Sequence, residues 1–143
     1  MSTAESCTGG RIASAITSVP GSSAYFLGSV ISYANDVKVN LLNVDGDAIH
    51  AHGAVSEDVV IQMANGVKEQ LNSTYAIAVS GIAGPDGGSE EKPVGTVWIA
   101  IAGPNETIAE KFLFRGDRKR ILQRTSQMGL SMARNEILRQ EPL

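Results

Sequence analysis

Thr3-Ala4-Glu5-Ser6-Cys7-Thr8-Gly9-Gly10 places two potential nucleophiles, a serine and a cysteine, just before a glycine pair that opens an apolar-periodic segment. Backbone N–H groups at a helix N-terminus have no partner within the helix, and the helix dipole makes that end positive. Such groups can hold a phosphate or a developing oxyanion. The stretch therefore predicts a reactive side chain beside amide donors or a simple helix cap, which is the commoner use of Ser and Thr there.

The rest of the chain alternates between helical and strand patterns. Helices are predicted over residues 9–18 and after Asn35 or Asp36, Ser56 and Asp117, and strands over residues 26–33, 75–79, 94–102 and 108–114. The short connection between the last two strands predicts an antiparallel hairpin. Together these patterns predict an α/β fold with a mixed sheet covered by helices on both faces. Because no linker or repeat divides residues 1–143, we expect one domain.

Composition narrows the class of protein. The 143 residues carry a net charge of −3, which argues against a general nucleic-acid binder, and the apolar runs are too short to cross a bilayer. A single cysteine and the absence of a signal-like N-terminus predict a cytoplasmic protein without disulfides. The basic run over residues 115–120 remains available for one anionic ligand.

A serine nucleophile needs a base, and the sequence offers histidine or lysine. His50 and His52 lie in a polar stretch, DGDAIHAHG, where surface histidines are expected, and their spacing does not suit a metal site. Lys38 follows Tyr33, the end of a predicted strand, and burial would lower its pKa enough for it to accept a proton. The alternative is a solvated lysine and a tyrosine used for packing.

A second glycine-rich stretch, SGIAGPDGG, follows the strand predicted over residues 75–79. Such loops let a ligand approach the backbone closely. The stretch matches neither dinucleotide nor Walker A patterns, so turn chemistry between strands is an equal alternative.

Six segments in order resemble the CinA C-terminal domain family, some of whose members are nicotinamide-nucleotide amidases. They are TAESCTGG (3–10), GSSAYF (21–26), SYANDVK (32–38), HGAVSEDV (52–59), SGIAGPDGGSEEKPVGTVW (80–98) and FRGDR (114–118). The resemblance implies a three-layer α/β/α sandwich with a mixed sheet. It also implies hydrolysis of nicotinamide mononucleotide, a small-molecule substrate, to nicotinate mononucleotide and ammonia, without a metal or cofactor.

The resemblance also assigns roles to individual residues. It implies Ser6 as the nucleophile of an acyl-enzyme mechanism, Lys38 as its base and Tyr33 as an assisting group, with Cys7 as a small neighbour. The residues that it implies for substrate or oxyanion binding are Thr8, Gly9, Gly10, Ser80, Gly81, Ala83, Gly84, Thr96 and Arg118.

Family members usually carry a helix and the start of a strand before TAESCTGG. From this difference we expect a sheet that lacks most of that strand, an exposed edge or apolar patch, and association into a homo-oligomer. Two other functions stay open: a nucleotide-binding or interaction module without turnover, and a thiol hydrolase that uses Cys7.

Overall fold

Five strands form one mixed sheet in the computed structural model, which describes residues 1–141. The strands are β1 (Ser2–Glu5), β2 (Gly28–Ile31), β3 (Ala76–Gly81), β4 (Thr96–Ala102) and β5 (Thr107–Leu113). Their order across the sheet is β2-β1-β3-β4-β5. β1 runs parallel to both of its neighbours, whereas β3, β4 and β5 pair antiparallel. The predicted mixed sheet and the predicted hairpin are therefore confirmed.

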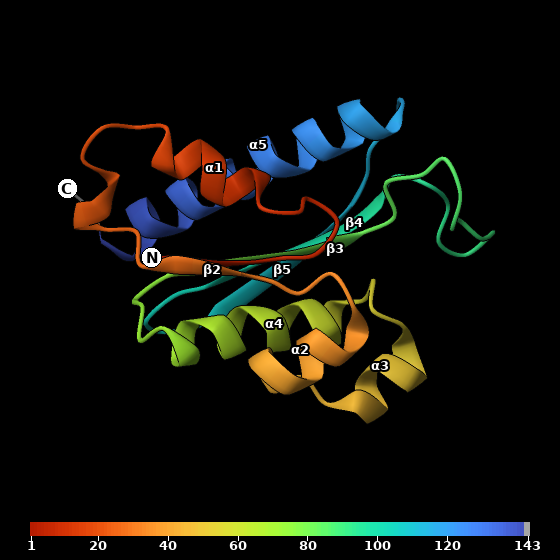
Figure 1. The fold of residues 1–143 in the computed structure, drawn as a ribbon, viewed down its shortest axis with the longest axis horizontal. Helices are drawn as coiled ribbons and strands as arrows, with labels where there is room; N and C mark the ends of the chain where they lie inside the picture. Colours follow the sequence, from red (N-terminus) through yellow and green to blue (C-terminus); the bar gives the residue numbers. More distant parts are fainter. Residues whose placement is uncertain (142–143) are drawn as a thin grey trace.

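Helices cover both faces of the sheet (Figure 1). They are α1 (Arg11–Thr17), α2 (Asn35–Leu42), α3 (Gly46–His52), α4 (Glu57–Gln70) and α5 (Arg118–Gln140), with a short 3-10 turn, η1, at Ser22–Ala24. α1 and α5 lie on one face, and α2, α3 and α4 lie on the other (Figure 1). The three-layer α/β/α sandwich is thus the observed architecture.

The two faces of β3 and β4 bury side chains of different size, because successive strand residues point to opposite sides. Alanines face α4, and β-branched residues such as Ile77 and Ile99 face α1 and α5. The small side chains allow α4 to lie close to the sheet. Gly66 brings α4 equally close to α2, because a Cβ at this position would lie 2.0 Å from the Leu42 carbonyl oxygen. α2 is therefore fixed firmly against α4.

Two of the predicted helix caps are correct and one is wrong. Ser56 caps α4 by accepting the N–H of Val59, and Asp117 caps α5 in the same way. α2 does begin at Asn35, but neither Asn35 nor Asp36 caps it; the cap position is Ala34, which has no side-chain acceptor.

The polar stretch DGDAIHAHG is helical, which the sequence reading did not predict. Its helix, α3, begins after Asp45, whose side chain accepts the N–H of Asp47. Ala48 lies on the buried side of α3, while His50 and His52 are exposed. The stretch has a normal cap and an apolar side, but it is only two turns long, so its periodicity is weak.

β1 is short, central and complete in its pairing. Each of its four residues is buried and pairs with both β2 and β3. With four residues, β1 is shorter than β3, β4 and β5, and the expectation that most of this strand is missing stays a prediction. β2 is shorter than the strand predicted over residues 26–33 and forms an open edge of the sheet, which leaves Ile31 exposed.

Candidate active site

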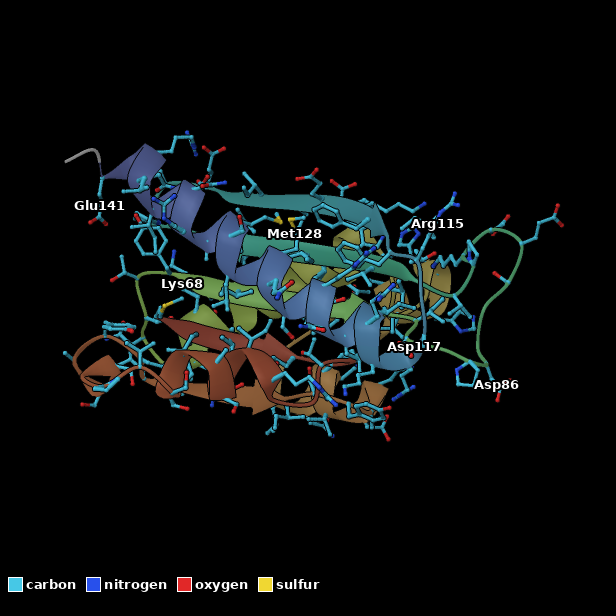
Figure 2. The ribbon with its side chains drawn as sticks, turned by 90° about the horizontal axis from the view of Figure 1, so that it is seen from above. Lys68, Asp86, Arg115, Asp117, Met128 and Glu141 are labelled. Atoms are coloured by element: carbon cyan, nitrogen blue, oxygen red, sulfur yellow. The ribbon has the colours of Figure 1, made fainter. Side chains whose placement is uncertain are left out.

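The candidate site lies where β1 and β3 end, at the end of the sheet from which α5 starts (Figure 1). Loops that leave the carboxyl ends of adjacent parallel strands commonly build binding crevices. Ser6 follows β1 directly, and its N–H donates to the Val79 carbonyl of β3 at 3.1 Å. Arg115 and Asp117, at the start of α5, lie at the same end as the glycine-rich loop that carries Asp86 (Figure 2).

Ser6 and Lys38 form a buried hydrogen-bonded pair. The distance between Lys38 Nζ and Ser6 Oγ is 3.1 Å, and the two residues are only 1% and 9% exposed, respectively. Lys38 Nζ also donates to the Ser32 carbonyl at 2.6 Å and to the Tyr33 carbonyl at 3.4 Å. The neighbouring carbonyls therefore orient the amine toward the serine hydroxyl.

Burial lowers the pKa of Lys38 below its ordinary value of 10.5, because an ammonium group loses its hydration there. The charge interaction with Cys7 opposes this shift of the Lys38 pKa, but it is smaller than the effect of burial. Within residues 1–141, no carboxylate forms an ion pair with Lys38. The amine is therefore suited to accept a proton from Ser6 Oγ.

The loop after Ser6 turns sharply at the glycine pair. Gly9 and Gly10 have φ values of 57° and 101°, a region that glycine occupies without steric cost. The N–H of Gly9 donates to the Ser6 carbonyl, so this amide is not available to an oxyanion. Within the described part of the chain, the N–H groups of Thr8 and Gly10 have no acceptor. Of the three amides that the resemblance implies for the oxyanion, those of Thr8 and Gly10 are thus available, and that of Gly9 is not.

Glu5 is a structural part of the site that the sequence reading missed. Its carboxylate is completely buried and accepts the N–H groups of Ile12 and Ala13 at 2.9 Å and the Thr8 hydroxyl at 2.7 Å. The positive end of α1 is therefore occupied by a side chain of the protein. The N–H groups of Ile12 and Ala13 are therefore not open to a ligand anion, contrary to the expectation for this helix end. The preference of acidic groups for helix N-termini was the available signal.

The glycine-rich loop after β3 is held by its own contacts. Ser80 is buried, and its hydroxyl donates to the Ala54 carbonyl at 2.8 Å. Gly81 must be small, because a Cβ there would lie 2.6 Å from Val97 Cγ2. The Thr96 hydroxyl likewise donates to a neighbouring carbonyl, that of Pro93, at 2.6 Å. In this structure the Ser80 and Thr96 hydroxyls thus stabilise the loop, and any contact with substrate would have to use their remaining acceptor capacity.

Arg118 joins the glycine-rich loop to the segment before α2. It donates to the Gly84 carbonyl at 2.7 Å and to the Tyr33 hydroxyl at 3.3 Å. The Tyr33 side chain is 62% exposed and contacts Arg118, whereas its carbonyl contacts Lys38. A guanidinium has five N–H donors, so Arg118 retains donors for an anion at the rim of the site.

Cys7 lies beside the pair but has the properties of a packing residue. It is buried with Ala83 and Leu122 in a small apolar cluster. Burial, reinforced by the nearby Glu5 carboxylate, raises the pKa of the Cys7 thiol to about 11. A protonated thiol is a poor nucleophile at neutral pH, which argues against the thiol hydrolase.

The described residues contain neither a metal-binding cluster of side chains nor a membrane-spanning helix. No group of three or more His, Cys, Asp or Glu side chains within residues 1–141 is arranged to hold a metal ion. No helix in the same range combines the length and apolar character needed to cross a bilayer.

The sequence matches the CinA C-terminal domain family over residues 1–137. The chain belongs to this family. It is similar to CinA-like proteins of Fervidobacterium nodosum, 48% identical over 139 residues, and of Geotalea uraniireducens, 49% identical over 138 residues. These alignments cover 97% and 96% of this CinA domain but only 34% and 33% of the two relatives. The chain thus spans about a third of the length of the curated relatives that it matches.

Solved structures of the family share the fold of this CinA domain. The CinA superfamily protein KP700603 from Klebsiella pneumoniae 700603 superposes with a TM-score of 0.92 at 32% identity, covering 97% of this chain and 86% of that one. The competence/damage inducible protein CihA from Agrobacterium tumefaciens gives 0.90 at 41% identity, covering 92% and 81%.

Proposed function

We propose that this CinA domain is an amidohydrolase that converts nicotinamide mononucleotide and water to nicotinate mononucleotide and ammonia. The observation that carries the proposal is the buried contact of 3.1 Å between Lys38 Nζ and Ser6 Oγ. A lysine that has lost its hydration and has no carboxylate partner can act as a base for a serine hydroxyl. The substrate itself comes from the family resemblance.

In the acylation step, Lys38 takes the Ser6 proton while Ser6 Oγ bonds to the carboxamide carbon. The amides of Thr8 and Gly10, which have no acceptor within the described residues, are available to bind the oxyanion that develops. Lys38 then gives its proton to the amide nitrogen, the C–N bond breaks, and ammonia leaves. An ester between Ser6 and the nicotinate carbonyl carbon remains.

In the second step, Lys38 takes a proton from water, and the resulting hydroxide attacks the ester. The C–O bond to Ser6 breaks, and the proton on Lys38 returns to Ser6 Oγ. Arg118 supports binding, because its exposed guanidinium lies at the rim of the site and can pair with the substrate phosphate.

The test measures ammonia released from nicotinamide mononucleotide by the parent protein, by Ser6→Ala and by the matched control Cys7→Ala. We expect Ser6→Ala to lower kcat by roughly 10⁶-fold, as when the serine nucleophile of a protease is removed, and Cys7→Ala to retain most of the activity. Equal activity of Ser6→Ala and the parent would contradict the proposal. Nucleotide binding by a parent protein that releases no ammonia would instead indicate a binding module.

A further inference from the structure

Ser32 connects the strand that carries the nucleophile to the proposed base. It follows β2 directly and is fully buried. Its N–H donates to the Glu5 carbonyl of β1 at 2.9 Å, and its own carbonyl accepts from Lys38 Nζ at 2.6 Å. Both backbone groups of Ser32 are therefore engaged with the elements that hold the buried pair.

The side chain of Ser32 is unusual because its hydroxyl has no partner. Among residues 1–141, it is the one buried side-chain polar group that makes no hydrogen bond. Burying a hydroxyl without a partner is unfavourable, so such a group calls for an explanation. A serine can also change rotamer, so the hydroxyl can form a new contact without movement of the backbone.

Strand alternation places this hydroxyl on the same face of the sheet as the buried pair. Ala4 and Val30 are register partners on β1 and β2, and both belong to the core beneath α2 and α4. Ser6 and Ser32 come two residues later, directly after the ends of β1 and β2. Their N–H groups continue the sheet hydrogen bonding, to the Val79 and Glu5 carbonyls, so the alternation carries on and both side chains point to that same face. Lys38 reaches this face from α2.

A protonated Lys38 has more N–H groups than close acceptors. An ammonium donates three hydrogen bonds. The Ser32 carbonyl accepts one at 2.6 Å, Ser6 Oγ lies at 3.1 Å, and the Tyr33 carbonyl lies at a long 3.4 Å. While the proton that points to Ser6 is transferred to the leaving nitrogen, the amine depends on its contacts with the Ser32 and Tyr33 carbonyls to keep its orientation.

We propose that Ser32 is a positioning residue for Lys38, and that its hydroxyl turns to accept an N–H of the protonated amine in place of the long contact to the Tyr33 carbonyl. The inference rests on the proposed function. The hydroxyl is free of partners when Lys38 is neutral and becomes an acceptor when Lys38 carries the proton taken from Ser6. No covalent bond of Ser32 forms or breaks.

Few other ionisable groups compete for this role. The Cys7 thiol interacts with Lys38 from the loop after β1, and Tyr33 and Arg118 lie beyond it at the rim. Glu5 belongs to the opposite face of the sheet, where it binds the start of α1. α4 packs against α2 with apolar side chains. An effect of Ser32 on the proton affinity of Lys38 is therefore separable from that of a neighbouring charge.

The experiment compares Ser32→Ala with Ser29→Ala, a matched loss of a hydroxyl three residues earlier, on β2. Ser29 bonds to Thr3, which shares the opposite face of the sheet with Glu5. Two quantities are measured for each variant: the pKa of the Lys38 amine by ¹⁵N NMR titration, and the pH profile of kcat for ammonia release.

For Ser32→Ala we expect a Lys38 pKa lower by about one unit, because the charged amine loses an acceptor, and a kcat lower by roughly tenfold with little change in KM. The acid limb of the kcat profile should shift to lower pH by the same amount, and Ser29→Ala should match the parent. An unchanged Lys38 pKa and an unchanged kcat profile in Ser32→Ala would overturn the inference. The NMR titration needs no turnover, so an unchanged Lys38 pKa would contradict the role of Ser32 and leave the amidase proposal standing. A failure of the amidase proposal would in turn leave the comparison of pKa values valid.

Discussion

Glu5 offers a quantitative test of how the loop around Ser6 is held, through the variant Glu5→Gln. One carboxylate oxygen accepts from Ile12 N–H and the Thr8 hydroxyl, and the other accepts from Ala13 N–H and, more weakly, the Thr3 hydroxyl at 3.3 Å. Glutamine has nearly the same shape, but an NH₂ group replaces one oxygen. Whichever way the amide turns, one backbone N–H at the start of α1 faces another donor.

The expected cost follows from these contacts. A hydrogen bond to a charged acceptor contributes about 1.5–3 kcal/mol, and leaving its buried donor unpaired costs about 1–3 kcal/mol. Allowing for partial relaxation at the half-buried Ala13, we expect Glu5→Gln to lower the free energy of unfolding by about 3 kcal/mol. For a domain of this length, that corresponds to a fall in Tm of roughly 10 °C.

Urea denaturation followed by circular dichroism measures this free energy, and calorimetry gives the Tm. The matched control is Glu110→Gln on the exposed side of β5, for which a change within about 0.5 kcal/mol is expected. If Glu5→Gln were as stable as the control variant, the carboxylate would not be holding the loop. The assigned contacts at α1 would then be wrong.

Two further predictions concern the same end of the sheet. Lys38→Met should abolish ammonia release without unfolding the protein. Because the pKa of Lys38 lies below 10.5 in the folded state, protonation of this amine favours unfolding, so the stability of the variant relative to the parent should rise as the pH falls below 10.5. Urea denaturation measures this difference in stability, and a difference that does not depend on pH would contradict a lowered pKa. Gly84→Ala should lower the free energy of unfolding by about 2 kcal/mol and raise KM, because the residue has a φ of 79°, an added Cβ would lie 2.5 Å from Val94 Cγ1, and the Gly84 carbonyl holds Arg118. The control Gly21→Ala, with a φ of 88° and open space around it, should show only the smaller cost of backbone strain. Equal effects of the two variants on stability would refute the steric argument.

Local signals in the sequence predicted the parts of the fold that depend on neighbouring residues. The caps at Ser56 and Asp117 could be foreseen because the side chain and the N–H that it accepts lie three residues apart. The start of α2 could not be assigned a cap, because Ala34 leaves that helix end without a side-chain acceptor. α3 was missed because two turns carry too little periodicity to distinguish a helix from a polar loop.

The site depends on contacts between distant segments, so its residues alone left the choice of base open. Lys38 is 32 residues from Ser6 in the chain, and local sequence favoured a solvated lysine. Its position became an expectation only through the family resemblance. Glu5 and Ser32 escaped notice for the same reason. The role of Glu5 depends on a loop that folds back onto α1, and that of Ser32 on the pairing of β1 with β2.

The most direct test of the central claim is to identify the atom that carries the acyl group during turnover. The parent protein is mixed with nicotinamide mononucleotide, quenched in acid within the first turnover, digested, and sequenced by tandem mass spectrometry. The acyl-enzyme mechanism predicts the mass of the nicotinate mononucleotide acyl group on Ser6 and its absence from Ser6→Ala. An adduct on Cys7, or ammonia release by Ser6→Ala at the rate of the parent, would contradict it.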